Sequence, residues 1–176
     1  MAALCVAMSP MATHGASGDP RADLPARKAG LWEVVVQAHA PAGGMRQAAQ
    51  TVRQCTDARA ERLMLLSIVP GQEHCSRFTV AGSAAGGGYD IVGACSVHDQ
   101  RVVLHAQLRG DLESAYSGTY RVEHASAAPV VNGSVDFQGR WLGQCGPGMR
   151  PGDMLLPNGI KVNVVDDIGR AEAQAH

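Results

Sequence analysis

Hydrophobic and polar side chains alternate with a period of two along much of the chain, and this pattern predicts β-strands. The clearest case is the segment 31–39, LWEVVVQAH, in which Trp32, Val34 and Val36 recur on one side. Further strand-like segments are 47–55, 75–81, 89–97, 102–108, 112–123 and 130–142. Glycine-rich or polar turns separate most of them. We therefore expect about six to eight antiparallel strands with short connections.

The segment after residue 55 is the exception, because its hydrophobic positions follow a helical period. Thr56 or Asp57 is suited to the N-cap position, Leu63 and Met64 lie in the apolar stripe, and Pro70 ends the segment. Strands joined by short links favour a meander, and a meander of this length curls. The sequence predicts a mainly β fold: a curved sheet, half-barrel or small barrel with one short helix after the second strand.

The chain divides into four parts on composition. Residues 1–18 contain no charged side chain and run from an apolar stretch into small residues, which resembles a secretory signal peptide. No basic residue precedes the apolar stretch. Either the true start lies upstream, or the segment is a disordered tail. We expect 19–29 to be a linker, 30–165 a single β-rich domain and 166–176 a frayed tail.

The cysteines also favour export. Removing residues 1–18 removes Cys5 and leaves Cys55, Cys75, Cys95 and Cys145, an even number that is typical of two disulfides in a small exported domain. The alternative is four buried free thiols in a cytosolic protein. Of the three possible connectivities we predict Cys55–Cys75 and Cys95–Cys145, although the hairpin near residue 85 also brings Cys75 close to Cys95.

Charge and motifs exclude several classes of function. There are 15 basic and 16 acidic side chains, so no basic surface for nucleic acid is indicated. No apolar stretch reaches the length of about 20 residues that spans a bilayer. The sequence contains no nucleophile-elbow, phosphate-loop or dinucleotide-binding motif, and its cysteines and histidines lack the spacing of metal ligands. We expect neither an enzyme nor a bound cofactor or metal.

Four aromatic residues are the candidates for ligand contact. Trp32 lies in the first expected strand and Trp141 near the end of the last, and these strands become neighbours in a closed meander. Tyr116 and Tyr120 have the same parity on one strand and so share its face. These four side chains either pack in the core or line a ligand cavity.

Several short motifs resemble one family. They are GLWEV at 30–34, a strand that ends in Gln54-Cys55 before a short helix, Cys75 and Cys95 on later strands, and WLGQCGPGMRPGDMLLPNG at 141–159. Together they resemble the small exported proteobacterial proteins catalogued as domain of unknown function 3617. The resemblance implies a periplasmic β-rich protein with disulfides, and it carries no activity.

Two functions follow from these observations as hypotheses. The first is a periplasmic or secreted binding module that holds a small apolar or amphipathic ligand, such as a lipid, against Trp32, Trp141, Tyr116 and Tyr120. The second is a structural or protein-interaction module of the cell envelope, which contacts a partner protein through the Gly- and Pro-rich segment 145–159. A cavity behind the tryptophans favours the first hypothesis, and a filled interior with an exposed apolar patch favours the second.

Overall fold

The computed structural model describes residues 19–39, 47–84, 86–124 and 133–174. The expected signal peptide at 1–18 and the first residues of the last expected strand, 130–132, lie outside the described residues. The strands are β1 (Gly30–His39), β2 (Gln50–Thr56), β3 (Cys75–Gly82), β4 (Gly88–Val97), β5 (Gln100–Asp111), β6 (Ala115–His124), β7 (Ser134–Gly143), β8 (Asp153–Leu155) and β9 (Lys161–Asn163). The helices are α1 (Glu61–Met64), the 3₁₀ turn η1 (Gln72–His74) and α2 (Val164–Gln174).

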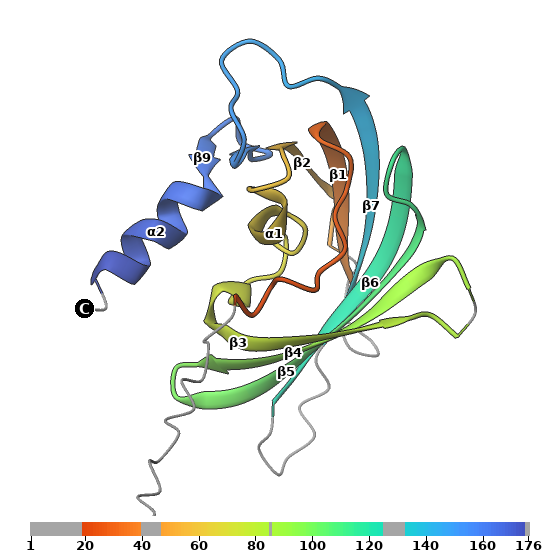
Figure 1. Cartoon of the computed structure of the whole chain (residues 1–176), viewed down its shortest axis with the longest axis vertical. Coiled ribbons are helices and arrows are strands. Elements are labelled where there is room, and N and C mark those ends of the chain that lie inside the picture. The colour runs from red at the N-terminus through yellow and green to blue at the C-terminus, as the bar shows by residue number, and fades with distance from the viewer. Residues whose placement is uncertain (1–18, 40–46, 85, 125–132, 175–176) are drawn as a thin grey trace, which may run out of the picture.

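All nine described strands belong to one antiparallel sheet in the order β3-β4-β5-β6-β7-β1-β2-β8-β9. The prediction of a curved, mainly β fold is confirmed. The sheet is open, with β3 and β9 at its edges, so the closed small barrel is not the form adopted. Figure 1 shows the sheet curling around α1. The first strand pairs with the seventh, and Trp32 lies directly opposite Trp141 in that pairing.

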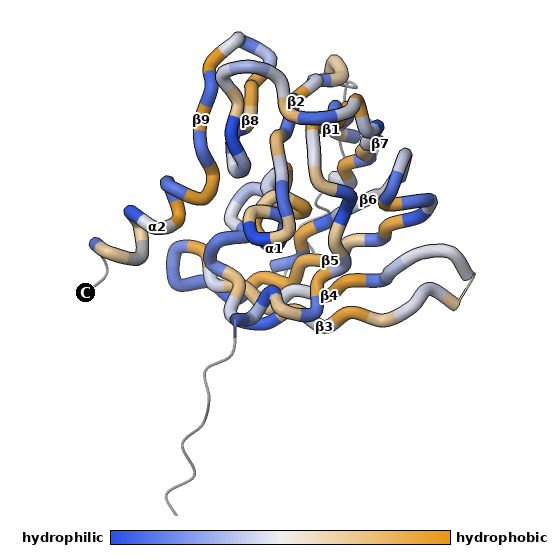
Figure 2. Tube along the Cα trace, turned by 45° about the horizontal axis from the view of Figure 1, so that its top comes forward, coloured by the Kyte–Doolittle hydropathy of each residue, from blue (hydrophilic) through white to orange (hydrophobic). Residues whose placement is uncertain are grey.

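The strand order explains how the concave face is filled. Although β2 and β3 follow one another in the chain, five strands (β4, β5, β6, β7 and β1) lie between them in the sheet. The connection 57–74 therefore crosses the concave face, where Leu65, Leu66 and Val69 are almost fully buried (Figure 1). Figure 2 shows hydrophobic positions recurring along β3, β4 and β5, whose inward side chains meet this connection. The result is a packed core under a curved sheet.

The short helix expected after residue 55 forms as α1. Asp57 starts the helical turn, since its Oδ1 accepts hydrogen bonds from the backbone N–H groups of Arg59 at 3.0 Å and Ala60 at 2.8 Å. The α-helical part ends at Met64, and turns carry the chain on to Pro70. Asp57 therefore caps this turn as the sequence predicts, and the prediction of one short helix after the second strand is confirmed.

The segment 19–29 differs from the expected linker, because it packs into the domain. Leu24, Arg21 and Arg27 are 8%, 7% and 4% exposed. The backbone N–H of Lys28 donates to the carbonyl of Leu112 at 2.9 Å. This segment has no hydrophobic period because it lies against the core as irregular backbone, with few side chains directed inward.

The C-terminal segment also has more structure than expected. The Gly- and Pro-rich region contains the short strands β8 and β9, and residues 164–174 form α2 in place of a frayed tail. The side chain of Asn163 begins α2, since its Oδ1 accepts from the backbone N–H of Asp166 at 3.0 Å. Strands of three residues are too short to show alternation. The Asn163 cap three residues before Asp166 was the available signal for the helix.

Candidate functional site

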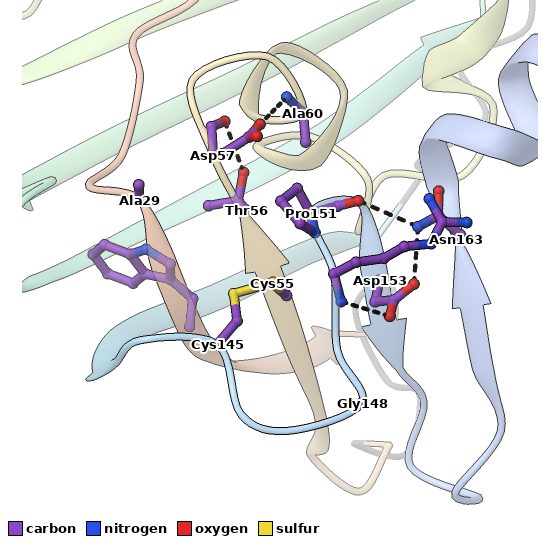
Figure 3. The surroundings of a disulfide bond; sticks show 12 residues. Ala29, Cys55, Thr56, Asp57, Ala60, Cys145, Gly148, Pro151, Asp153 and Asn163 are labelled. Atoms are coloured by element: carbon purple, nitrogen blue, oxygen red, sulfur yellow. Dashed lines mark hydrogen bonds between the residues drawn. A yellow bond between two sulfur atoms is a disulfide. The ribbon is translucent and has the colours of Figure 1, made fainter.

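The two disulfides correct the predicted connectivity. They join Cys55 to Cys145 and Cys75 to Cys95, rather than Cys55 to Cys75 and Cys95 to Cys145. Cys75 and Cys95 are direct cross-strand partners in the β3–β4 hairpin. Leu31 pairs with Cys55 on one side and with Gly143 on the other. The chain that leaves β7 therefore passes Cys55, where Cys145 bonds to it (Figure 3).

The structure brings three of the four candidate aromatic residues together in the core. Trp32 is fully buried, and Tyr116 and Tyr120 are 4% and 7% exposed. The rings of Trp32 and Tyr116 are 5.4 Å apart, and both tyrosine rings lie about 6 Å from that of Phe137. The predicted shared face of the tyrosines is therefore present.

Trp141 has different surroundings from the other three. It is only partly buried, and its Nε1 donates to the carbonyl of Ala29 at 3.1 Å. The ammonium group of Lys28 lies 4.1 Å from the centre of its ring. Trp141 thus contacts the end of the segment 19–29 and holds it against the sheet.

A buried charge covers the aromatic cluster. The Arg27 guanidinium donates to both carboxylate oxygens of Glu61, at 2.6 and 3.0 Å, and it also donates to Gln54 Oε1 at 2.7 Å and the Tyr116 hydroxyl at 2.9 Å. Its central carbon lies 5.4 Å from the centre of the Trp32 ring. Sequence reasoning missed this network because Arg27 lies in the expected linker. Protein side chains therefore occupy the space above Trp32.

Burial and pairing shift two pKa values in this network. Burial raises the pKa of Tyr116, and the neighbouring Arg27 charge only partly offsets that rise. Burial acts to lower the pKa of Arg27, but Tyr116 and Glu61 outweigh it, so the net direction is upward. Arg27 stays charged and Tyr116 neutral, which suits a fixed structural contact rather than a proton-transfer step.

An apolar pocket lies beside the Cys75–Cys95 disulfide, between η1 and the strands β4, β5 and β6. Its volume is about 160 Å³. The lining residues are Val69, Pro70, Gly71, Gln72, Cys75, Cys95, Val97, Val102, Leu104, Val122 and His124. The pocket is thus walled by aliphatic side chains and a disulfide.

Gln72 and His124 are the two residues with polar side chains in the pocket wall, and Gln72 is the buried one. It is only 4% exposed, and its Oε1 is buried without a hydrogen-bond partner among the described residues. A buried acceptor left unpaired costs about 1–3 kcal/mol. The pocket therefore combines an apolar wall with one unmet acceptor, a pattern that sequence reasoning did not identify because Gln72 has no motif around it.

The outer face of the sheet carries paired charges. Arg53 pairs with Glu33 at 3.6 Å, and Arg121 pairs with Glu123 at 2.8 Å. Within the described ranges, no group of three or more His, Cys, Asp or Glu side chains is placed to hold a metal ion. Among the helices described, none has the length and apolar character needed to cross a membrane.

Comparison with known proteins gives one match. The family model described as "Protein of unknown function (DUF3617)" matches residues 27–145. The matched region begins at Arg27 and ends at Cys145, so it includes the buried ion pair and both disulfides. No curated protein and no solved structure matches the chain.

Proposed function

The chain belongs to the DUF3617 family of proteins of unknown function, and for this member we propose a non-catalytic role in the periplasm, as a module that binds the apolar part of a small amphipathic ligand. The single observation that carries the proposal is the pocket beside the Cys75–Cys95 disulfide. Export is supported by the two disulfides, because such bonds persist in oxidising compartments.

The size of the pocket limits the ligand. A cavity of about 150 Å³ lined by aliphatic side chains holds a molecule the size of benzene. The present pocket, at about 160 Å³, accommodates a similar group of about six heavy atoms. Larger ligands insert only one end. Burial of that end is favourable by about 25 cal/mol for each Å² of apolar surface removed from water.

Gln72 indicates the polar part of the ligand. Its unpartnered Oε1 needs a donor, so the proposed ligand carries a hydroxyl or amide N–H next to its apolar end. The aromatic cluster around Trp32 is filled by Arg27 and Glu61, so the proposed binding site is the pocket rather than that cluster.

A second candidate function is a protein-interaction module of the envelope. The observation that favours it is exposed apolar surface beside the Gly- and Pro-rich segment, where Leu142 is 39% and Ile160 55% exposed. The binding module is preferred because these two residues are isolated, whereas the pocket is a continuous apolar site with a polar group.

Native mass spectrometry is the first test. The mature protein is purified from a periplasm without detergent, and a small molecule released on denaturation supports the binding module. Titration then uses 1-hexanol and its methyl ether as probes. The six-carbon chain of each probe matches the size of the pocket, but only the alcohol donates a hydrogen bond. We expect the alcohol to bind about fivefold more tightly, the value of one hydrogen bond of about 1 kcal/mol.

Two variants locate the binding. Val97→Phe fills the pocket, while Val92→Phe makes the same change on the exposed face of the same strand, β4. Binding should be lost only in the first. Gln72→Met keeps the shape and should remove the preference for the alcohol. Equal binding by the two phenylalanine variants, or no binding of either probe to the wild type, rejects the proposal in favour of the interaction module.

A further inference from the structure

A second hollow lies between the segment 19–21, α1 and α2. It is a surface groove of about 500 Å³. The lining residues are Asp19, Arg21, Ala58, Arg59, Arg62, Leu63, Val165, Ile168 and Gly169. None of them lines the apolar pocket beside Cys75–Cys95. The groove is therefore a separate candidate site.

Arg21 is a buried cation, and no carboxylate among the described residues pairs with its guanidinium. The residue is 7% exposed, and its Nε has no hydrogen-bond partner in the described part of the chain. Within the same ranges the guanidinium donates one hydrogen bond, to the carbonyl of Gln72 at 3.4 Å. Buried charges in proteins are normally paired, because removing a charge from water is costly. An anion is the group that would satisfy Arg21.

The single acidic residue that lines the groove does not fill this role. Asp19 accepts from the backbone N–H of Arg21 at 2.9 Å, and its other oxygen pairs with Arg62 at 3.3 Å. Arg59 adds a further guanidinium, for which no ion pair is formed within the described part of the chain. Three cations thus face one carboxylate, which leaves the groove positive.

The two acidic residues in the first turn of α2 form ion pairs with other residues. Asp166 pairs with Arg150, and Asp167 pairs with Arg170. The residues that α2 gives to the groove are apolar, Val165 and Ile168, and Leu63 of α1 lies with them in a small hydrophobic cluster. The groove therefore has a cationic side and an apolar side.

We propose that this groove binds an anionic amphipath. An oxyanion, carboxylate or phosphate, pairs with Arg21 and is held further by Arg59 and Arg62. The hydrocarbon part lies on Leu63, Val165 and Ile168. The proposal does not depend on the apolar pocket, since it concerns other residues and an anion, so either proposal can fail alone.

The test is isothermal titration of the full chain with inorganic phosphate and with decyl phosphate at fixed ionic strength. The wild type should bind decyl phosphate at least tenfold more tightly than phosphate, because each buried methylene contributes about fourfold. The variant Arg59→Ala/Arg62→Ala should lose at least tenfold in affinity for decyl phosphate. Arg101→Ala, which removes an exposed charge on β5, is the control and should bind as the wild type does.

Arg21→Met tests the buried cation, with thermal unfolding as the check that the variant folds. If it folds, it should bind decyl phosphate at least tenfold more weakly, and if it does not, the double variant decides. Vesicles of phosphatidylglycerol form a further arm. Wild-type binding to vesicles that the double variant loses identifies a lipid headgroup as the source, whereas binding of decyl phosphate alone identifies a soluble amphipath. Equal affinity in the double variant and Arg101→Ala, or equal affinity for the two phosphates, overturns the proposal.

Discussion

At the scale of single residues, the most consequential contact is the buried ion pair between Arg27 and Glu61. Both side chains are within 1% of complete burial. Gln54 Oε1 and the Tyr116 hydroxyl accept the two hydrogens of Nη1, so each of the three guanidinium nitrogens has a hydrogen-bond partner. A buried pair of this kind contributes little net free energy relative to apolar residues, but breaking it is costly because one charge remains.

Replacing one partner should therefore destabilise the fold more than replacing both. Arg27→Met leaves Glu61 buried and unpaired, and we expect a loss of about 3–5 kcal/mol in the free energy of unfolding. The double variant Arg27→Met/Glu61→Met should lose much less. Urea unfolding measures both, and Arg121→Met, in an exposed pair on β6, should be close to wild type. A double variant as unstable as Arg27→Met would contradict this account.

At the scale of single residues, the sequence predicted the features that depend on the two-residue period of a strand. The shared face of Tyr116 and Tyr120, and the neighbourhood of Trp32 and Trp141, could be predicted because they depend on strand parity and strand order. The buried position of Arg27 could not be predicted in this way. A lone arginine in an irregular segment gives no pattern, and arginine is seldom buried. For the same reason the unmet groups of Gln72 and Arg21 become visible only in three dimensions.

At the scale of elements, β6 and β7 pair aromatic residues with glycines. Tyr116 lies opposite Gly139, and Gly118 lies opposite Phe137. A Cβ atom on Gly139 would come within 2.1 Å of the Tyr116 ring, and one on Gly118 within 2.4 Å of the Phe137 ring. Each glycine thus leaves room for the ring on the neighbouring strand. This arrangement allows two large rings to lie flat under a strongly curved part of the sheet.

Gly139→Ala should weaken this pairing. The added methyl group must displace the Tyr116 ring, and overpacking of this kind costs about 1–3 kcal/mol. Gly146→Ala is the matched control, since no atom lies within 4 Å of a Cβ built there. Thermal unfolding of the two variants and the wild type gives the comparison. If Gly139→Ala melts with the control, the tight contact with the ring is not present in solution.

At the scale of elements, whether a strand could be predicted depended on how many residues it contains. Segments of seven or more residues with clear alternation, such as 31–39 and 89–97, were predicted and form β1 and β4. The strands β8 and β9 have three residues each, and their position is fixed by hydrogen bonds to β2 and to each other rather than by local pattern. Propensity over so few residues carries little information, so the sequence pattern did not predict these two strands.

At the scale of the whole molecule, the two disulfides close loops of very different length. Cys75–Cys95 closes a hairpin with a separation of 20 residues, whereas Cys55–Cys145 joins segments 90 residues apart. The predicted connectivity was wrong, since the register of the β3–β4 hairpin places Cys75 opposite Cys95. The sheet order places β1 between β2 and β7, and this brings Cys145 to Cys55. Register, which sequence does not show, decided the pairing.

The longer-range disulfide should contribute more stability. Loop-closure entropy assigns about 4.6 kcal/mol to a loop of this length and about 3.3 kcal/mol to the shorter one. Their sum is comparable to the total stability of a small domain, about 5–15 kcal/mol. We therefore expect Cys55→Ser/Cys145→Ser to lower the free energy of unfolding by about 1 kcal/mol more than Cys75→Ser/Cys95→Ser, and full reduction to leave the domain marginally stable.

For ligand binding we expect the opposite order: the less destabilised variant, Cys75→Ser/Cys95→Ser, should lose more affinity. Cys75 and Cys95 line the apolar pocket, and Cys55 and Cys145 do not. Loss of the Cys75–Cys95 bond should therefore weaken 1-hexanol binding, while loss of the other bond, although more destabilising, should leave the affinity of the folded protein unchanged. Urea unfolding and 1-hexanol titration of both variants provide the measurement. Equal loss of binding in the two variants would mean that the pocket depends only on overall stability, whereas the expected crossover would tie the pocket to the hairpin disulfide that forms its wall.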